Sequence, residues 1–254
     1  MTNEYKILLL DVDGTTVASN GEALPSERVV KAVKEAQKHL HVALATGRPI
    51  QLAETVYSAL GLHGPSVFNG GAEIIDVSTN KVLHRQLLSV YVLKELVKLA
   101  LPFGYEVYTD YDQYEAVINS PEQIEHEAAK LFIEAVNTKD AISLLEELTA
   151  VEGASAHPTT SWNDGDVVDI HITHEHATKR YGVDRLLSIL GLSKEQAIAI
   201  GDGHNDIPLL ESAGFKVAMG NAPDEVKAIA DYVAPTIDDD GVAETIERHI
   251  LNVH

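Results

Sequence analysis

The chain has 254 residues, 45% of them hydrophobic and 23% charged, which is usual for a globular protein of one or two domains. It contains no apolar run of about 18 residues and no charged-then-apolar amino terminus, so we expect neither a membrane span nor a secretory signal, and place the protein in the cytoplasm. The absence of cysteine excludes disulfides and thiolate metal sites. A formal charge of −20 would repel a phosphate backbone, so nucleic acid is not an expected partner.

The first predicted strand, residues 7–10, is a continuous apolar run followed by the segment Asp11-Val12-Asp13-Gly14-Thr15. A run of this kind indicates a strand buried on both faces, and open α/β sheets bind ligands beyond the carboxyl ends of such strands. Because side chains alternate along a strand, Asp11 and Asp13 should face the same way. The two carboxylates therefore stand where a site is expected, although a plain Asp-Gly turn would also account for this segment alone.

Helices and strands alternate over the next part of the chain. The pattern predicts helix 29–36, strand 42–45, helix 52–60 and strand 65–68. Ser26 is placed to cap the first of these helices and Gly61 to close the second. The two strands run into the polar or glycine-rich segments Thr46-Gly47-Arg48 and Asn69-Gly70-Gly71.

The alternation resumes near the carboxyl terminus. Helix 183–190 is stopped by Gly191, and strand 197–200 runs into Gly201-Asp202-Gly203-His204-Asn205-Asp206. Strand 216–219 follows, then a helix opened by Asn221 as N-cap with Pro223 just inside it, and a short strand 232–233. Strands that alternate with helices predict an α/β fold with a Rossmann-like, doubly wound parallel sheet.

The middle of the chain has a different order. It is predicted to hold helix 89–100, paired strands 105–109 and 114–119, a helix that starts at Ser120-Pro121, helix 141–148 and strand 167–173. Paired strands among helices indicate an α+β arrangement rather than a continuation of the βα alternation. We therefore expect residues 83–175 to form an inserted domain and residues 1–82 with 176–254 to form the core.

Four separated segments together resemble the haloacid dehalogenase superfamily of phosphatases: Asp11 to Thr15, Thr46-Gly47-Arg48, Lys179, and Gly201 to Asp206. The long insertion between the second and third of them is similar to the large α/β cap (type C2) of the Cof-type subfamily. The resemblance implies a phosphomonoester hydrolase that acts on a small phosphorylated metabolite, with sugar phosphates as the first class to consider. It also implies that the cap closes over the substrate, which excludes water and sets specificity.

The resemblance assigns roles to the carboxylates. Asp11 would attack phosphorus and form an aspartyl phosphate, while Asp13 would protonate the leaving alcohol and then deprotonate the hydrolytic water. Mg²⁺ would be held by the side chains of Asp11 and Asp202 and by the backbone carbonyl of Asp13. Asp206 would be either a further metal ligand or a partner of one.

The phosphate-binding groups implied by the resemblance are the Thr46 hydroxyl, the Gly47 amide, Lys179 and Asn205. Taken alone, Thr46-Gly47 would equally be a plain strand-to-helix cap. The family usually has glycine after its lysine, whereas this chain has Arg180. The choice of Lys179 over Arg180 is therefore open at this stage.

Two further segments allow more than one interpretation. Asn69-Gly70-Gly71 resembles an Asn-Gly-Ala turn of the family and would serve either as a turn or in substrate contact. The stretch that holds His171, His174, Glu175 and His176 would suit a transition metal by its ligand types, but its place favours a hinge where the chain returns to the core.

Other activities would use the same residues. A phosphotransferase or phosphomutase of this fold would pass the phosphoryl group to a second alcohol instead of to water. A regulatory protein would accept phosphate on Asp11 without turnover, as response-regulator receivers do. Asp13 argues against the regulatory role, because a general base beside an aspartyl phosphate should hasten its loss.

Overall fold

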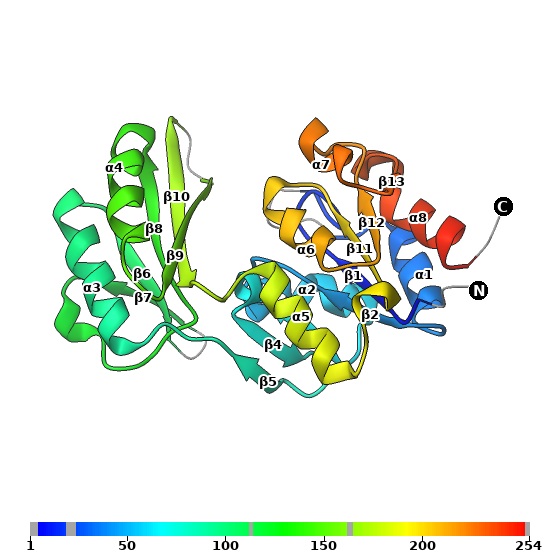
Figure 1. Ribbon diagram of the computed structural model, residues 1–254, viewed down its shortest axis with the longest axis horizontal. Helices are drawn as coiled ribbons and strands as arrows, with labels where there is room; N and C mark the ends of the chain where they lie inside the picture. Colours follow the sequence, from blue (N-terminus) through cyan, green and yellow to red (C-terminus); the bar gives the residue numbers. More distant parts are fainter. Residues whose placement is uncertain (1–4, 19–23, 112–113, 162–164, 252–254) are drawn as a thin grey trace. The chain divides into compact units, whose positions relative to one another are not determined.

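The protein consists of two compact units. The structure is a computed structural model that describes residues 5–18, 24–111, 114–161 and 165–251 (Figure 1). The first unit comprises residues 1–84 and 178–254, and the second comprises residues 85–177. The sequence analysis places both junctions two residues earlier along the chain.

The first unit is built on a five-stranded parallel sheet. Its strands, in the order β13-β12-β11-β1-β2, are Tyr232–Val233, Phe215–Ala218, Ala197–Gly201, Ile7–Leu10 and His41–Leu44. The central strand β1 pairs with both neighbours, so that Leu10 lies beside Ile200 and Leu44. This register brings the carboxyl ends of three strands to one edge of the sheet, where the sequence analysis expects the site.

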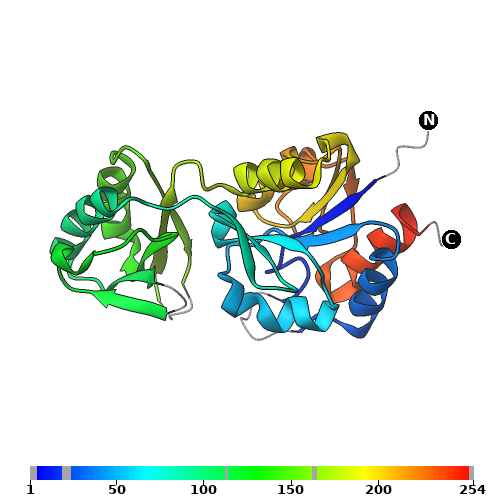
Figure 2. The same cartoon turned by 90° about the horizontal axis from the view of Figure 1, so that it is seen from below.

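Helices cover both faces of this sheet (Figure 2). Leu8 and Leu10 of β1 pack in one core with α1 (Glu27–Ala36), α2 (Ile50–Leu60) and α8 (Gly241–His249). Ile7 and Leu9 pack in a second core with α5 (Lys179–Leu190), α6 (Ile207–Glu211) and α7 (Asp224–Ala228). Successive β1 side chains thus enter opposite cores, as in a sheet buried on both faces. The doubly wound α/β fold is confirmed, and none of the described helices is long and apolar enough to cross a membrane.

Most of the predicted helix ends agree with the structure. The Ser26 hydroxyl accepts a hydrogen bond from the Val29 amide at the start of α1, and Gly61 ends α2 in the left-handed conformation. The prediction that Asn221 caps the following helix is wrong, because Pro223 occupies the N-cap of α7. The Asn221 side chain instead donates to the Gly14 carbonyl, after β1, and to the Asp202 carboxylate, after β11.

The strand after α2 is correctly predicted, but its place in the parallel sheet is not. β3 (Pro65–Phe68) forms an antiparallel three-stranded sheet with β4 (Glu73–Asp76) and β5 (Lys81–Arg85). A single parallel bridge, Ala45 to Val67, links it to the end of β2. The tight turn after β3 lets it pair at once with β4, a local partner that the sequence analysis did not identify.

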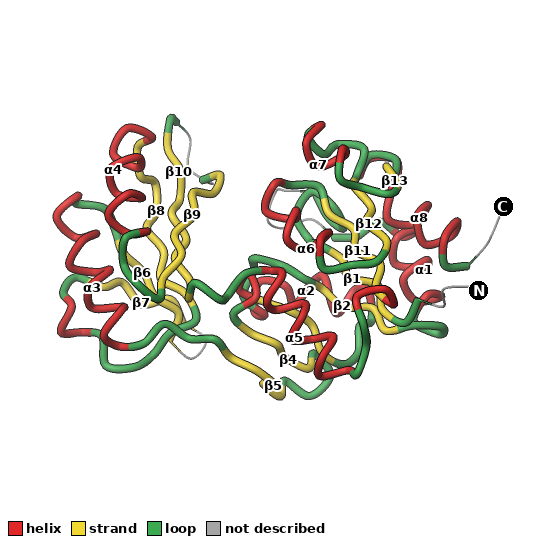
Figure 3. Tube along the Cα trace, in the orientation of Figure 1, coloured by secondary structure: helices red, strands yellow, loops and turns green. Residues whose placement is uncertain are grey.

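The second unit has a five-stranded antiparallel sheet with two helices on one face (Figure 3). Its strands, in the order β7-β6-β8-β10-β9, are Tyr114–Ile118, Val107–Tyr111, Lys130–Asn137, Val167–His174 and Ala154–Thr160. The helices are α3 (Val90–Ala100) and α4 (Thr138–Thr149), which bury their apolar faces in a core of this unit's own. The α+β prediction for the insertion is confirmed.

Two elements of this unit differ from the prediction. Ser120 and Gln123 form a capping box, but it starts only the 3₁₀ turn Pro121–Gln123 and no longer helix. The central strand β8 follows, and neither it nor the edge strand β9 was predicted. The Ser-Pro start signal was overestimated because the residues after it gain more by pairing in the sheet than by continuing a helix.

Candidate active site

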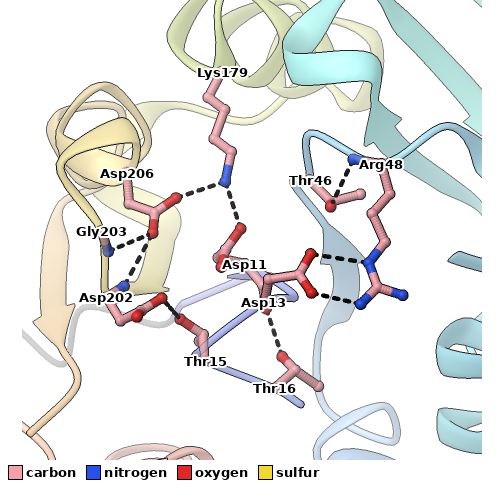
Figure 4. A network of polar contacts seen from close by, with 10 residues as sticks. All are labelled: Asp11, Asp13, Thr15, Thr16, Thr46, Arg48, Lys179, Asp202, Gly203 and Asp206. Atoms are coloured by element: carbon pink, nitrogen blue, oxygen red, sulfur yellow. Dashed lines mark hydrogen bonds and ion pairs between the residues drawn. The ribbon is translucent and has the colours of Figure 1, made fainter. Parts of the chain in front are cut away.

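The chain folds back on itself immediately after β1. The Asp11 amide donates to the Ile200 carbonyl at 3.0 Å, which extends the pairing with β11 by one residue. The Thr16 hydroxyl then donates to the Asp11 carbonyl at 2.6 Å, and the amides of Thr16 and Val17 both donate to the Val12 carbonyl at 2.9 Å. This closed turn holds the Asp11 and Asp13 side chains at the edge of the sheet (Figure 4).

Lys179 is the cation at the centre of the site (Figure 4). It is the first residue of α5, whose N-cap is Thr178, and its side chain is 5% exposed. Its Nζ lies 2.5 Å from Asp11 Oδ1 and 2.6 Å from Asp206 Oδ1. Arg180 is exposed and pairs with Glu211 on the surface of this unit, so the structure brings Lys179, not Arg180, to the carboxylates.

Asp206 has both carboxylate oxygens engaged. Oδ1 accepts from Lys179, and Oδ2 accepts from the backbone amides of Asp202 and Gly203 at 3.0 Å each. Asp206 thus ties the loop after β11 to α5. This arrangement suits a residue that orients its neighbours, the second of the two alternatives left open for Asp206 by the sequence.

Three carboxylates form the one cluster of metal-ligand type found among the described residues. Asp11, Asp202 and Asp206 each offer an oxygen, and these oxygens lie within 4.8 Å of one another. Asp202 Oδ1 accepts from the Thr15 hydroxyl at 3.0 Å, and its Oδ2 accepts from Asn221 Nδ2 at 3.2 Å. We call Asp11, Asp202 and Asp206 the acidic triple.

The acidic triple has more negative charge than its one buried cation, Lys179, can neutralise. Burial and the charge of Asp206 raise the pKa of Asp11 above its ordinary value, against the opposing effect of Lys179. Burial also raises the pKa of Asp202 to about 6, although the hydrogen bond from Thr15 acts in the other direction. Burial alone would lower the pKa of Lys179, but Asp11 and Asp206 raise it, so Lys179 stays protonated.

The site fits a divalent cation in both ligand type and charge. Carboxylate oxygens are the ligands that Mg²⁺ prefers. Counting one charge each, the four aspartates of the site (Asp11, Asp13, Asp202 and Asp206) carry −4, and the cations Lys179 and Arg48 carry +2. The remaining −2 equals the charge that one divalent ion would neutralise.

Asp13 is paired with Arg48, a residue to which the sequence analysis gave no role. Arg48 Nε donates to Asp13 Oδ2 at 2.9 Å, and Nη2 donates to Oδ1 at 2.5 Å. The Arg48 side chain is 10% exposed. The Asp13 side chain thus lies outside the acidic triple, which leaves only its backbone carbonyl for the predicted metal contact. The only signal in the sequence was that an arginine directly follows Thr46-Gly47.

The predicted phosphate-binding loop lies at the end of β2. The buried Thr46 hydroxyl accepts from the Arg48 amide at 3.1 Å, which leaves the hydroxyl proton available to a ligand. Gly47 is exposed, and a Cβ at this position would meet no atom within 4 Å. Asn205 is also exposed, in the turn after β11, and no hydrogen bond joins its side chain to the other site residues within the described parts of the chain.

The Asn69-Gly70-Gly71 segment connects the phosphate-binding loop to Lys179. The Asn69 amide donates to the Arg48 carbonyl and the Gly70 amide to the Thr46 carbonyl, both at 3.0 Å. A Cβ on Gly71 would lie 2.0 Å from the Thr178 carbonyl oxygen, so only glycine lets the turn approach the start of α5 this closely. These contacts give the segment a structural role as a turn.

The histidine-rich stretch belongs to the second unit and does not form a metal cluster among the described residues. The His171 ring meets the Phe132 ring edge-on at 6.1 Å, and burial together with Lys130 and His157 lowers its pKa to about 3. His174, the last residue of β10, contacts His176 just after the strand. The structure therefore gives no support to the transition-metal alternative.

Comparison with known proteins places the chain in a family. Residues 8–149 and 106–246 match the haloacid dehalogenase-like hydrolases. Phosphoglycolate phosphatase 1 of Saccharolobus solfataricus is 30% identical over 96% of this chain and 95% of its own length. The 5-amino-6-(5-phospho-D-ribitylamino)uracil phosphatase of Bacillus subtilis is also 30% identical, over 98% of this chain and 97% of its own length.

The fold leads to the same assignment. A haloacid dehalogenase-like hydrolase from Bacteroides thetaiotaomicron, known from its crystal structure, superposes with a TM-score of 0.82 at 26% identity and covers 96% of this chain and 99% of its own. The resemblance deduced from the four motifs is thus confirmed over nearly the whole sequence. The chain belongs to the haloacid dehalogenase-like hydrolase family of enzymes.

Proposed function

We propose that the protein is a Mg²⁺-dependent phosphomonoester hydrolase that works through an aspartyl-phosphate intermediate. The observation that carries the proposal is the buried Lys179 Nζ, which joins Asp11 to Asp206 at 2.5 and 2.6 Å within a site that retains two excess negative charges. Phosphoryl transfer depends mainly on positioning and on compensation of charge, and a fixed lysine and a metal-binding acidic triple supply both.

Asp11 is the proposed nucleophile. One of its oxygens is held by Lys179, so the orientation of the carboxylate is fixed before substrate binds. Attack on phosphorus forms the Asp11–phosphate bond and breaks the bond between phosphorus and the leaving oxygen. Lys179 stays charged throughout and offsets the charge of the phosphate.

Asp13 is the proposed acid and base. Protonated, it gives its proton to the leaving oxygen; ionised, it removes a proton from the water that hydrolyses the aspartyl phosphate. The Thr46 hydroxyl and the Gly47 amide are proposed to bind phosphate oxygens, since the hydroxyl proton is available and Gly47 is exposed with open space where a side chain would be. Asn205, exposed beside the acidic triple, is proposed as a further contact to the phosphate.

Asp11 and Asp202, together with the Asp13 carbonyl, are proposed to hold Mg²⁺, with Asp206 as the partner that fixes their loop. When bound, Mg²⁺ would supply positive charge to the equatorial phosphate oxygens. The pairing of Asp206 with Lys179 and two amides keeps Asp202 in place for this task.

The proposed substrate is a small phosphorylated metabolite, with sugar phosphates as the first class to test. The two curated relatives support this size class, because their names refer to phosphoglycolate and to a phosphorylated ribitylaminouracil. We propose hydrolysis rather than transfer to a second alcohol, because both curated relatives are named as phosphatases.

Phosphate release from a panel of sugar phosphates, phosphoglycolate and nucleotides, measured with and without Mg²⁺, tests the proposal. Magnesium-dependent release that is lost in Asp11→Asn supports it. An isomeric phosphate without free phosphate would instead establish a mutase. Full activity in a chelator, or near-normal turnover in Asp11→Asn, would contradict the metal or the nucleophile assignment respectively.

A further inference from the structure

We propose that Arg48 is a positioning residue for Asp13, which holds the carboxylate apart from the acidic triple and releases one of its oxygens when the phosphate ester binds. This inference rests on the proposed phosphatase function.

Arg48 binds the Asp13 carboxylate through two of its nitrogens, with N–O distances of 2.9 and 2.5 Å. We call this two-point contact the fork. Such bidentate pairs fix geometry as well as charge. The third guanidinium nitrogen, Nη1, donates to the Leu52 carbonyl in α2 at 3.0 Å, so the fork itself is anchored in the core unit. Arg48 thus determines where the Asp13 carboxylate lies.

Without this fork the Asp13 carboxylate could turn toward the acidic triple. Asp11 and Asp13 follow the same strand two residues apart, and Asp202 lies within the same site. A free Asp13 side chain would be drawn to any cation bound by the acidic triple. Its acid and base function requires the opposite, namely a carboxylate that meets the leaving oxygen and not the metal.

The fork must also open during the reaction. In the resting arrangement both Asp13 oxygens accept from Arg48, so the carboxylate cannot turn toward a leaving group without breaking one of these hydrogen bonds. The backbone of Arg48 is joined to the phosphate-binding loop, because its amide donates to Thr46 Oγ1 and its carbonyl accepts from Asn69. An ester bound at Thr46 and Gly47 would therefore bring its anionic oxygens close to Arg48 and compete for the guanidinium.

The first step transfers the phosphoryl group from the ester to Asp11. As the ester binds, the released Asp13 oxygen takes up a proton from the solvent. Asp11 then forms a bond to phosphorus, the bond from phosphorus to the leaving oxygen breaks, and the proton on Asp13 passes to the leaving oxygen. The alcohol departs, and Asp13 is left as a carboxylate that Arg48 can take back.

Two esters whose leaving groups differ in basicity can show whether Arg48 acts through the acid Asp13 or affects activity in general. We would measure alcohol release in a single turnover with enzyme in excess, using p-nitrophenyl phosphate, whose leaving group departs without a proton, and the best alkyl phosphate from the panel. Arg48→Gln removes the fork, and Arg48→Lys keeps the charge without it. Arg28→Gln is the control, because Arg28 forms a similar two-point contact with Glu247 on the exposed surface.

We expect Arg48→Gln to slow release from the alkyl ester by about 10- to 100-fold, a part of the full effect of general acid catalysis. Release from p-nitrophenyl phosphate should fall far less, Arg48→Lys should lie between, and the Arg28→Gln rates should equal the wild-type rates. Equal losses for both esters, or no loss for either, would overturn the role of Arg48.

The two proposals fail in different ways. If the wild-type protein released alcohol from neither ester, the phosphatase proposal itself would be wrong. If the wild-type protein were active but Arg48→Gln slowed both esters equally, only the positioning role of Arg48 would be wrong. Should Arg48→Gln not fold, Arg48→Lys decides the question by the same comparison of the two esters.

Discussion

At the scale of single residues, Lys179 decides the charge balance of the site. It is buried between Asp11 and Asp206, and the sequence next to it offers a second cation, Arg180, that lies on the surface. A buried ion pair stabilises little compared with apolar packing, but the loss of one partner leaves the other charges buried and uncompensated. We therefore expect Lys179 to be required for the arrangement of the carboxylates as well as for its proposed contact with phosphate.

We expect Lys179→Met to lower the free energy of unfolding by about 3–5 kcal/mol, because Asp11 and Asp206 lose their shared cation. Arg180→Met, the matched change at the next residue, should alter it by no more than about 0.5 kcal/mol. Urea denaturation of both variants checks this. Similar losses in the two would show that Lys179 does not hold the carboxylates as described.

Asp202 should make the stability of the metal-free protein fall as the pH rises. Its folded-state pKa of about 6 lies above the usual aspartate value of about 3.9, so between these values the folded state binds more protons than the unfolded state. Its stabilising effect is complete below about pH 4 and is lost as the pH rises through about 6. Mg²⁺, which binds the ionised form, should therefore stabilise the protein more at pH 8 than at pH 5.

Thermal unfolding with and without Mg²⁺ at the two pH values measures this difference. At a hundredfold excess over the dissociation constant, binding stabilises by about 2.7 kcal/mol, a rise in Tm of about 5–10 °C for a chain of this size. Asp202→Asn should raise the Tm of the metal-free protein and abolish the metal-dependent shift. A shift of equal size at pH 5 and pH 8 would contradict the assignment.

Gly47 is predicted to matter for the reaction and not for the fold. Its backbone lies outside the left-handed region, and a Cβ would enter open space. Gly47→Ala should therefore leave the protein as stable as before or more stable by up to about 1 kcal/mol. Alanine keeps the amide, but its methyl group would crowd a phosphate bound there and weaken this hydrogen bond to a charged group, so KM should rise about 10-fold or more. An unchanged KM would remove the Gly47 amide from the phosphate site.

At the scale of elements, the start of α5 is held by the turn between β3 and β4. The helix places Lys179, and the turn carries hydrogen bonds to the loop of Thr46 and Arg48. Gly71 has a φ of +115° and lies against the Thr178 carbonyl, whereas Gly70 has a φ of +66° and open space beside it. The same turn thus offers a crowded and an uncrowded glycine.

Gly71→Ala should disturb α5 and with it Lys179. The side chain would meet the helix backbone at 2.0 Å, so we expect a loss of more than about 2 kcal/mol in stability together with reduced activity. Gly70→Ala carries only the strain of a left-handed alanine, about 1–2 kcal/mol, and should keep its activity. Denaturation curves and kcat values of both variants check this; equal behaviour would mean that the close approach does not position Lys179.

The elements that the sequence predicted well carry strong local signals. Ser26 and Gly61 mark helix ends by their own chemistry, and the apolar run of β1 allows no exposed face. β3 and β8 were misplaced or missed because their state depends on a partner strand that the sequence does not name. Asn221 has the residue type of an N-cap, but its amide finds partners in Gly14 and Asp202 instead.

At the scale of the whole molecule, the two units have separate cores. The acidic triple, Lys179 and the Asp13–Arg48 pair all lie in the unit of residues 1–84 and 178–254, and the unit of residues 85–177 buries its own apolar side chains. A chain with two cores need not unfold in one step. Each core should therefore respond separately to changes at the site.

Calorimetry should show two unfolding transitions, of which only one moves with Mg²⁺. The proposed metal ligands all belong to the first unit, so the free energy of metal binding should appear in that transition. In Asp202→Asn, neither transition should move when Mg²⁺ is added. A single transition that shifts as a whole would show that the two cores unfold together.

The sequence by itself determined the family, the α/β core with its α+β insertion, and the edge of the sheet at which Asp11, Asp13 and Asp202 meet. This was possible because buried strands, helix caps and acidic strand ends each depend on residues that are neighbours in the sequence. Only the tertiary structure decided that Lys179 rather than Arg180 joins the carboxylates, that Arg48 holds Asp13, and that Asn221 bonds Asp202. Those pairs join residues 19 to 168 positions apart, and which side chains meet over such separations depends on how the elements pack.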